Sequence, residues 1–190
     1  MSNVRRRRAS IVSNSALSIR IGSVADAETI SALAIQVFLD TYATEGVSPG
    51  LANEAFAEYG QAIFAQRLGQ EGRSFYLAER NAALLGFAEV QQDHKESPIP
   101  GVGGSQLVRL YVQPQAQRSG IGRTLLQATE RCALDARTAG VWLSAWEHNA
   151  RALAFYSRQH YEDVGHVQYV IQGQSFGNRI LFRPVVSGDA

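Results

Sequence analysis

The sequence predicts a mixed α/β domain in which helices flank a central, mostly antiparallel sheet of about seven strands. Three features lead to this prediction. Strand-like and helix-like runs follow one another along the 190 residues, as in folds that pack helices against a sheet. Two pairs of strand-like runs are separated by short turns, which is typical of β-hairpins. A turn with two glycines, Gln117–Arg123, joins a strand-like run to a long helix-like run.

The first half of the chain contains three expected strands and three expected helices. The strands show alternating apolar side chains, and the helices show an apolar stripe at helical spacing. Asp26 is a candidate N-cap for the first helix, and Ser48–Gly50 marks a break before the second. Arg80–Ala82 joins two strands as a hairpin. The expected strands are residues 16–21, 74–79 and 83–91, and the expected helices are residues 27–39, 51–59 and 61–68.

The second half begins with an expected loop at residues 93–105, which is rich in proline and glycine. In the strand that follows, strict alternation would place Leu107 on the face of Arg109 and Tyr111. Gly140 is suited to the left-handed turn that ends the long helix. The expected strands are residues 106–112, 141–146, 164–171 and 176–182, the last two joined through Gly173, and the expected helices are residues 121–137 and 150–159.

The composition is typical of a soluble globular protein, with 45% hydrophobic and 18% charged residues. By length we expect one domain, residues 17–190, after a basic, disordered tail at residues 1–16. No apolar run reaches the roughly 18 residues that suggest a membrane span, and no secretory signal is visible. Cys132, the sole cysteine, lies on the apolar stripe of the long helix. A single cysteine favours a reducing, cytoplasmic location.

Charge is distributed unevenly between the tail and the rest of the chain. The net charge is +1, and Arg5–Arg8 supply four positive charges, so the remaining residues are mildly acidic. A mildly acidic domain suits a cationic substrate better than nucleic acid. The arginine run could contact nucleic acid or anionic lipid, but no aromatic residue accompanies it. We therefore expect a solvated tail.

The turn Gln117–Arg123 is a candidate phosphate-binding site. Gly120 and Gly122 allow a tight turn with unobstructed amides, and the following helix presents unpaired N–H groups and the positive end of its dipole. A Walker loop would require Gly-Lys-Ser/Thr, whereas residues 122–124 are Gly-Arg-Thr. A dinucleotide fingerprint would require a third glycine where Leu125 stands. Both of these phosphate-binding folds are therefore excluded.

Two motifs together resemble the GCN5-related N-acetyltransferase (GNAT) superfamily. Leu110–Val112, followed by Pro114 and by Gln-x-x-Gly-x-Gly at residues 117–122, is similar to its acyl-CoA signature. Asn149–Tyr156, followed by Tyr161, is similar to its second motif. The resemblance runs from about residue 17 to residue 184. It implies an acetyl-CoA-dependent N-acetyltransferase in which two parallel strands, residues 106–112 and 141–147, splay apart around the cofactor arm.

A narrower resemblance concerns the acceptor. Ala-Trp-Glu-His-Asn at residues 145–149 is most similar to the PaiA-type polyamine acetyltransferases. The acceptor implied is a polyamine or other small amine, with a peptide or protein amino terminus second. One position departs from the family pattern: His160 stands where the family usually has glycine, although histidine accepts a left-handed conformation better than most residues.

The resemblance also implies how acetyl-CoA is held. Backbone N–H groups of the glycine turn would bind the pyrophosphate, and Arg118 and Arg123 either add charge-assisted contacts or remain solvated. An N–H group of Val112 or its neighbour would stabilise the oxyanion. Asn149 would orient the cofactor arm, cap a helix, or do both. The implied cofactor-binding residues are Leu110, Tyr111, Val112, Gln117, Arg118, Ser119, Gly120, Ile121, Gly122, Arg123, Asn149 and Tyr156, and no metal is implied.

Tyr156 occupies the family position of the acid that protonates the leaving thiolate. A phenol with a pKa of about 10 stays protonated at neutral pH, although the same ring could simply pack in the core. The general base is open between Glu147 and Glu89, in that order, and each could instead be a pairing carboxylate. His148 is a third candidate by its ordinary pKa, but strand alternation points it away from Glu147.

Two rival functions remain beside the enzyme. A non-catalytic acyl-CoA-binding regulatory module would keep the glycine turn but would need no proton donor. A nucleic-acid-associated protein would act through Arg5–Arg8. If the protein is an enzyme, we expect direct transfer in a ternary complex, because Cys132 would be buried without an adjacent base. A homodimer is compatible with the sequence.

Overall fold

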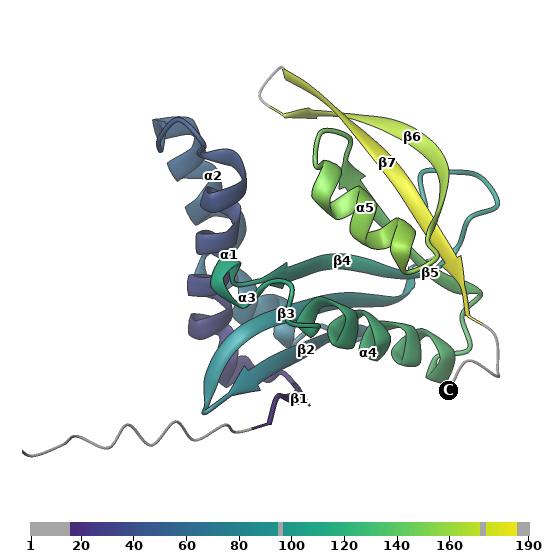
Figure 1. Cartoon of the computed structure of the whole chain (residues 1–190), viewed down its shortest axis with the longest axis horizontal. Coiled ribbons are helices and arrows are strands. Elements are labelled where there is room, and N and C mark those ends of the chain that lie inside the picture. The colour runs from purple at the N-terminus through teal and green to yellow at the C-terminus, as the bar shows by residue number, and fades with distance from the viewer. Residues whose placement is uncertain (1–15, 95–96, 172–173, 186–190) are drawn as a thin grey trace, which may run out of the picture.

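A mixed sheet organises the computed structural model, which describes residues 16–94, 97–171 and 174–185. Within these ranges seven strands lie in the order β1-β2-β3-β4-β5-β7-β6 (Figure 1). Neighbouring strands are antiparallel except β4 and β5, which are parallel. The expected mixed, mostly antiparallel sheet is therefore confirmed. The strands are β1 Ser18–Ile21, β2 Arg73–Arg80, β3 Ala83–His94, β4 Gly104–Val112, β5 Gly140–Trp146, β6 Glu162–Ile171 and β7 Gln174–Pro184.

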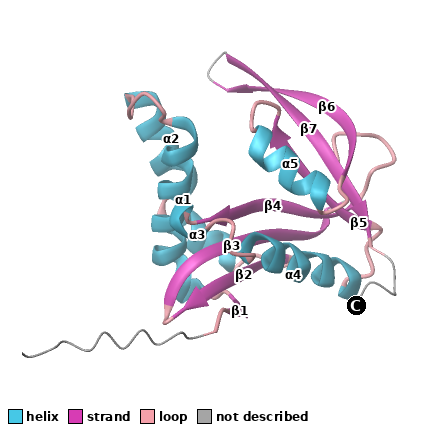
Figure 2. Ribbon diagram, in the orientation of Figure 1, coloured by secondary structure: helices cyan, strands magenta, loops and turns pink. Residues whose placement is uncertain are grey.

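Helices cover both faces of the sheet (Figure 2). α1 and α3 pack on one face of β2 and β3, whereas α4 packs on the other face. α5 lies on the same side as α4 and packs against β5 and β7. The helices are α1 Ala27–Tyr42, α2 Pro49–Tyr59, α3 Gln61–Leu68, α4 Ile121–Asp135 and α5 Ala150–Arg158, with short 3₁₀ turns η1 Val24–Asp26 and η2 Pro114–Ala116.

An apolar core lies on each side of the sheet. On the α1 side Phe64, Phe75 and Phe87 are fully buried, with ring centroids 5.9 to 6.2 Å apart. On the α4 side the predicted helix stripe, including Leu125 and Cys132, is buried against the sheet. Burying each large apolar side chain contributes about 1.5–3 kcal/mol. The two cores therefore hold β2 and β3 between layers of helices.

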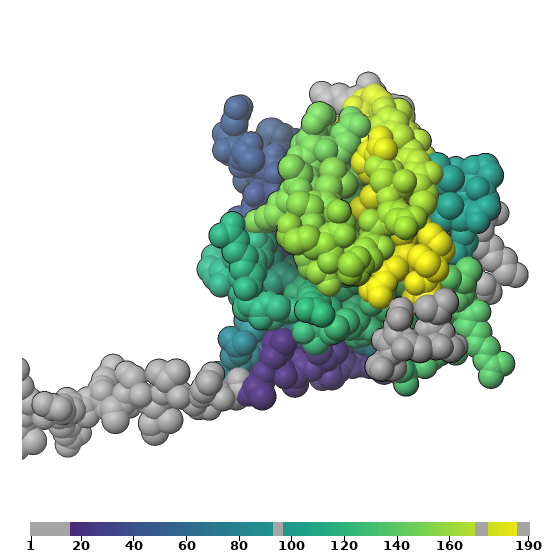
Figure 3. Space-filling model, turned by 45° about the vertical axis from the view of Figure 1, so that its right-hand side comes forward, coloured from purple at the N-terminus to yellow at the C-terminus, as the bar shows by residue number. Residues whose placement is uncertain are grey.

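β4 and β5 are paired over a very short stretch. Ser105 pairs with Val141 and Gln106 pairs with Trp142, and no further pairs join these two strands. Beyond them β4 stays bonded to β3, and β5 stays bonded to β7. The two half-sheets, β1–β4 and β5–β7, consequently diverge, as the family resemblance implied (Figure 1). In the space-filling view the green-to-yellow residues of the second half lie above the purple residues of the first (Figure 3).

A β-bulge in β4 reverses the predicted orientation of Leu107. Glu89 pairs with Arg109, and Val90 pairs with Leu107, so Val108 is an extra residue in β4. Leu107 therefore joins the core on the α4 side, away from the face of Arg109. Strict alternation predicted a shared face, and this was wrong because a bulge shifts the alternation by one residue.

The first two helices are longer than predicted. α1 continues to Tyr42 instead of ending near Leu39. α2 begins at Pro49, two residues before the expected start, because Ser48 caps it. The Ser48 hydroxyl accepts a hydrogen bond from the Leu51 amide at 3.3 Å. Proline is well suited to the first turn of a helix, where its missing N–H would have no partner.

The end of α4 also differs from the prediction. The helix stops at Asp135, and Arg137 (φ 55°) takes the left-handed conformation predicted for Gly140. Gly140 instead begins β5, where a Cβ would collide with the Arg183 carbonyl oxygen. His160 does adopt a left-handed conformation (φ 63°), as expected for its position at the end of α5.

The first hairpin is tighter and longer than predicted. Its turn has positive φ at both Asn81 and Ala82, 54° and 59°, which is the backbone that a two-residue hairpin turn requires. β3 then continues to His94, which pairs with Gly104 of β4. The region predicted as a loop from residue 93 is therefore partly strand.

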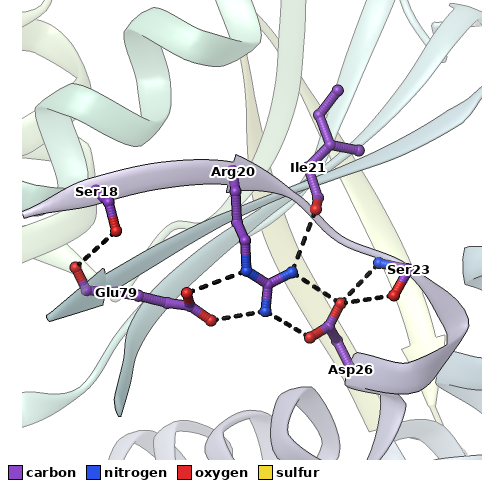
Figure 4. A network of polar contacts seen from close by, with 6 residues as sticks. All are labelled: Ser18, Arg20, Ile21, Ser23, Asp26 and Glu79. Atoms are coloured by element: carbon purple, nitrogen blue, oxygen red, sulfur yellow. Dashed lines mark hydrogen bonds and ion pairs between the residues drawn. The ribbon is translucent and has the colours of Figure 1, made fainter. Parts of the chain in front are cut away.

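Charged side chains fasten β1 to β2 and to the start of α1 (Figure 4). Arg20 donates to both carboxylate oxygens of Glu79, at 3.0 and 2.7 Å, and to both of Asp26, at 2.9 and 2.6 Å. Asp26 also accepts from the amide and hydroxyl of Ser23. Hydrogen bonds from Arg20 lower the pKa of Asp26 below its usual range. Asp26, the predicted N-cap, makes no side-chain capping bond to α1.

No helix within the described ranges is long and apolar enough to cross a membrane. Residues 1–15, with Arg5–Arg8, and the predicted hairpin turn at Gly173 lie outside the described residues.

Candidate active site

A cavity of about 460 Å³ lies where β4 and β5 part. Its lining comes from α1, from the end of β4, from the glycine turn with the start of α4, and from α5. Because α1 and α5 pack on opposite faces of the sheet, a cavity that reaches both must cross the sheet. The lining residues are Val37, Phe38, Thr41, Tyr42, Leu110, Tyr111, Val112, Gln117, Arg118, Gly120, Gly122, Arg123, Asn149, Arg151, Ala152, Ala154, Phe155, Tyr156 and Arg158.

The glycine turn brings the amino terminus of α4 to the cavity. Gly120 is left-handed (φ 87°) and immediately precedes the helix, and Arg118 is also left-handed (φ 62°). The Ser119 hydroxyl donates to the Ala116 carbonyl at 2.5 Å and so ties the turn to η2. The amides of the first helical turn have no acceptor within the helix. The turn therefore offers N–H groups and a positive dipole end to an anion.

Four arginines line the cavity: Arg118, Arg123, Arg151 and Arg158. None forms an ion pair with a carboxylate in the described part of the chain. Arg151 instead donates to the amide oxygen of Gln117 at 2.6 Å. No aspartate or glutamate is among the lining residues. This excess of positive charge favours a ligand that carries several negative charges.

β4 presents an unpaired backbone edge to the cavity. The Gln113 amide donates to the Leu85 carbonyl of β3 at 2.8 Å. Alternate residues of a strand direct their backbone groups to opposite edges, so those of Val112 and Leu110 face the gap beside β5. The Val112 carbonyl accepts from the Gln117 side chain at 3.1 Å, in agreement with this orientation. The edge can pair with the amides of an extended ligand.

Tyr156 and Asn149 reach the cavity from α5. Tyr156 is buried, and this burial raises the pKa of its phenol above the usual value. Its hydroxyl therefore stays protonated over the whole physiological range. The Asn149 side chain accepts from the Ala152 amide at 3.0 Å and caps α5. Asn149 both caps the helix and lines the cavity.

An aromatic wall closes the α1 end of the cavity. Phe38 and Tyr42 lie side by side on α1, with ring centroids 5.1 Å apart. Tyr111 lines the same end, and its hydroxyl donates to the Tyr59 hydroxyl at 3.2 Å. Tyr42 also meets Trp146 of β5, at 5.6 Å between centroids, so it bridges the two half-sheets.

Glu89 lies outside the lining residues and is fully buried. It forms ion pairs with Arg73 and with Arg109, the latter at 2.7 Å. Two guanidinium groups thus hold this carboxylate in place. The side chain predicted as a second candidate base therefore occupies the position of a structural anchor between β3 and β4.

Glu147 also lies outside the lining residues. Its carboxylate lies over Gly177 of β7 and is 3.1 Å from Nε2 of His166. Trp146, its neighbour in β5, points to the opposite face and meets Tyr42. His148 shares the face of Trp146, with ring centroids 5.2 Å apart. Strand alternation predicted that His148 points away from Glu147, and this was wrong: the strand ends at Trp146, and His148 Nε2 lies 3.8 Å from a carboxylate oxygen of Glu147.

The structure brings most of the predicted cofactor residues to one cavity. Ser119 and Ile121 are exceptions: Ser119 stabilises the turn, and Ile121 is buried in the core. The sequence reading missed residues on α1 and α5. A weak signal existed on α5, where Arg151 and Arg158 are seven residues apart and so share a helical face with Tyr156's neighbour Phe155. For α1, the family resemblance implies that the helices after the first strand form one wall of the acceptor pocket, but no residue pattern singled out Phe38 or Tyr42.

Comparisons with known proteins agree with the geometry. Residues 38–161 match the acetyltransferase (GNAT) family. An uncharacterized N-acetyltransferase from the pepI 3′ region of Lactobacillus delbrueckii subsp. lactis is 25% identical over 130 residues, which are 66% of this chain and 73% of the relative.

Solved structures that share the fold include the following two. The PaiA N-acetyltransferase of Thermoplasma acidophilum, in complex with coenzyme A, aligns with a TM-score of 0.67 and 21% identity, over 86% of this chain and 98% of that one. Arabidopsis thaliana NAA60, in complex with acetyl-CoA, aligns with a TM-score of 0.66 and 19% identity, over 90% and 99%. Since the family match spans well over half of its residues, the chain belongs to the acetyltransferase (GNAT) family.

Proposed function

We propose that this protein transfers an acetyl group from acetyl-CoA to the primary amine of a small molecule. Membership of the family makes it an acyltransferase with acetyl-CoA as the donor. The observation that carries the proposal is the cavity across the sheet, which has an arginine-rich end beside α4 and α5, Tyr156 in its wall, and an uncharged end at α1. Donor and acceptor would meet from opposite faces of the sheet.

The arginine-rich end would hold the donor. The amides at the start of α4 would bind the pyrophosphate, and Arg118 and Arg123 would add charge-assisted hydrogen bonds. The open edge of β4 at Leu110 and Val112 would pair with the amides of the pantetheine arm. Asn149 lies across the cleft at the start of α5 and would contact the arm from the other side.

The chemistry is an attack of the amine nitrogen on the thioester carbonyl carbon. The C–N bond forms, the C–S bond breaks, and the Val112 or Leu110 amide would stabilise the developing oxyanion. Tyr156 would donate its proton to the leaving thiolate. The attacking nitrogen loses a proton in the same reaction. Because neither Glu147 nor Glu89 lines the cavity, that proton would leave through water.

Direct transfer between the two bound substrates is favoured over a covalent intermediate. Cys132 is buried on α4 and accepts a hydrogen bond from the Gln92 side chain at 3.0 Å. It is not among the lining residues. A thiol in this position has no access to the thioester.

The acceptor class proposed is a small primary amine, and a polyamine is the candidate that the sequence puts first. Two observations support it: the residues that follow the arginine-rich tail are mildly acidic, and the fold is shared with a PaiA N-acetyltransferase. The class is tested by thiol release from acetyl-CoA with purified protein and a panel of spermidine, spermine, alkylamines and amino-terminal peptides. Release that depends on an amine supports the enzyme. Tight acetyl-CoA binding without release on any amine would indicate a binding module instead.

A further inference from the structure

The α1 end of the cavity differs chemically from the other end. All four lining arginines lie in the turn, α4 or α5, on the side opposite to α1. The lining residues that α1 contributes are Val37, Phe38, Thr41 and Tyr42, none of which is charged. A polyanionic donor is therefore drawn to one end, which leaves the aromatic end for the acceptor.

Ring contacts join the aromatic side chains at this end into one cluster, of which Phe38, Tyr42 and Tyr111 line the cavity. Phe38 meets Tyr42 and Tyr59, at 5.1 and 5.0 Å between centroids. Tyr42 meets Trp146 at 5.6 Å, and Tyr59 meets Tyr111 at 6.2 Å. Tyr42 is 39% exposed, whereas Phe38 is buried behind it. An incoming molecule would therefore meet the Tyr42 ring first.

Two glutamates beside the Tyr59 end of these rings are paired with arginines. Arg109 lies over the Tyr59 ring, 5.4 Å from its centroid, and pairs with Glu89 and more distantly with Glu58. Glu58 also pairs with Arg67 at 3.2 Å, and Glu89 pairs with Arg73. These three arginines and two glutamates leave a local excess of positive charge. Neither glutamate is therefore free to pair with a second ammonium group of the acceptor, and no carboxylate lines the cavity.

We infer that the acceptor is a monoamine on an apolar, alkyl or aromatic body, selected by the ring of Tyr42, and that polyamines are poorer substrates. This inference rests on the proposed acetyltransferase function and narrows its acceptor class. Ring faces and methylene groups supply the binding energy through apolar burial and cation–π attraction. The positive surroundings also favour the neutral, nucleophilic form of the bound amine. The polyamine expectation came from the charge of the whole chain, whereas this cavity has no acidic lining residue.

The test measures kcat/KM for a series of n-alkylamines, for phenethylamine and for spermidine, with the full chain and saturating acetyl-CoA. We expect kcat/KM to rise about fourfold per added methylene, as for burial of an apolar chain. Phenethylamine should exceed spermidine by about tenfold or more, because only its ring gains aromatic contact.

Variants of Tyr42 test whether its ring selects the acceptor. Tyr42→Ala should raise the acceptor KM about 10- to 100-fold, the worth of one buried aromatic contact, while the acetyl-CoA KM stays within about twofold. Tyr42→Phe keeps the ring and should rescue most of the acceptor KM that Tyr42→Ala loses. Tyr42→Glu should shift the preference toward spermidine by adding the missing carboxylate. Tyr169→Ala removes another exposed tyrosine, 42% exposed on β6 and outside the cavity lining, and should change neither KM.

The outcomes separate this inference from the proposed function. If spermidine is acetylated better than every monoamine, the inference is overturned while the acetyltransferase stands. If Tyr42→Ala acetylates all amines as wild type does, the aromatic wall does not select the acceptor and the inference again fails. If no amine of either class releases thiol, the proposed function fails and the inference fails with it.

Discussion

Tyr156 is the residue on which catalysis should depend most directly. Replacing it by phenylalanine keeps the ring in the core and removes only the hydroxyl that would protonate the thiolate. We expect Tyr156→Phe to lower kcat by about 10²–10⁴-fold, the usual contribution of a general acid. Acetyl-CoA affinity and thermal stability should change little, since one hydrogen bond contributes about 0.5–1.5 kcal/mol net. Steady-state kinetics and cofactor Kd on the same preparation measure both effects.

Tyr161 provides the matched control. It is a buried tyrosine whose ring lies 5.7 Å from that of Tyr156, but it does not line the cavity. Tyr161→Phe should retain turnover. Wild-type kcat in Tyr156→Phe would assign the proton donor to another group or to water.

Glu89 should matter for folding more than for catalysis. It is fully buried between Arg73 and Arg109, and removing one member of a buried charged group typically costs about 3–5 kcal/mol. We expect Glu89→Gln to lower the free energy of unfolding by about that amount, measured by denaturant titration. Turnover per folded molecule should stay close to that of the wild type.

A variant of the neighbouring Glu58 tests whether burial of the carboxylate causes the loss of stability expected for Glu89→Gln. Glu58 also pairs with Arg109, but its side chain is 48% exposed, so Glu58→Gln should cost less than about 1 kcal/mol. A Glu89→Gln protein of normal stability with a large loss of kcat would instead identify Glu89 as the general base.

At the scale of elements, the glycine turn before α4 should control donor binding. Gly120→Asp places a negative charge at the helix terminus that would hold the pyrophosphate. A like charge close to a phosphate costs of the order of 1 kcal/mol or more, so acetyl-CoA affinity should fall about tenfold or further. Calorimetry or equilibrium dialysis measures the Kd directly.

The backbone strain of this substitution has its own control. Gly120 (φ 87°) and Gly101 (φ 80°) are both left-handed, and a Cβ at either would meet no atom within 4 Å. Gly101→Asp should therefore share the strain of about 1–2 kcal/mol without weakening acetyl-CoA binding. Equal loss of affinity in both variants would remove the turn from the donor site.

The contact between β1, β2 and α1 should make stability sensitive to acid. Asp26 has a lowered pKa because Arg20 donates hydrogen bonds to it, so it binds a proton more readily in the unfolded chain, where its pKa is about 4. Its contribution to stability is therefore complete above that value and is lost as the pH falls through the lowered folded pKa.

Arg20→Gln should remove the pH dependence of stability that arises from Asp26. Because Arg20 is 42% exposed, the loss at neutral pH should be only about 0.5–1 kcal/mol, and the variant should lose less stability than wild type between about pH 5 and pH 2. Denaturant titrations across this range measure the difference. Arg80→Gln is the control, since Arg80 of β2 forms no ion pair among the described residues. Parallel pH profiles for wild type and Arg20→Gln would contradict the assignment.

Much of each element could be read from the sequence because local patterns determine it. The alternation of β2 and the stripe of α4 follow directly from burial on one face. The bulge at Val108 and the cap at Ser48 were missed, because an extra strand residue and a two-residue shift in a helix start change no apolar periodicity. The left-handed residue after α4 is Arg137 and not Gly140, since close packing in the sheet required the glycine elsewhere.

At the scale of the whole molecule, the sheet was predictable, but the individual α1 residues that line the cavity were not. The glycine turn, β4 and Tyr156 belong to recognisable motifs close to one another in the sequence. Phe38 and Tyr42 reach the same cavity from about seventy residues earlier, and only the crossing of the sheet between β4 and β5 brings them there. The aromatic wall arises from tertiary packing, and no local sequence pattern predicts it.

Donor binding should be visible in the backbone where the sheet is open. The amides of Leu110 and Val112 face the gap, so in the free protein they should exchange with solvent faster than those of the paired residues of β3. Acetyl-CoA should slow their hydrogen exchange by about tenfold or more, because it would supply the missing acceptors. Mass spectrometry or NMR of the free and bound protein reports this, with β2 amides as the internal control. Unchanged exchange on saturation would place the cofactor arm elsewhere.

The two residue pairs that join β4 to β5 also imply something about motion. A sheet resists bending through its continuous ladder of hydrogen bonds, and here that ladder narrows to Ser105–Val141 and Gln106–Trp142. The remaining contacts across the gap include the single ring pair of Tyr42 and Trp146. A donor that lies in the gap and contacts both half-sheets would therefore restrict their motion relative to one another. The relative motion of the half-sheets would decrease when acetyl-CoA binds and increase again when coenzyme A leaves. The amplitude of this motion would therefore change in step with each turnover.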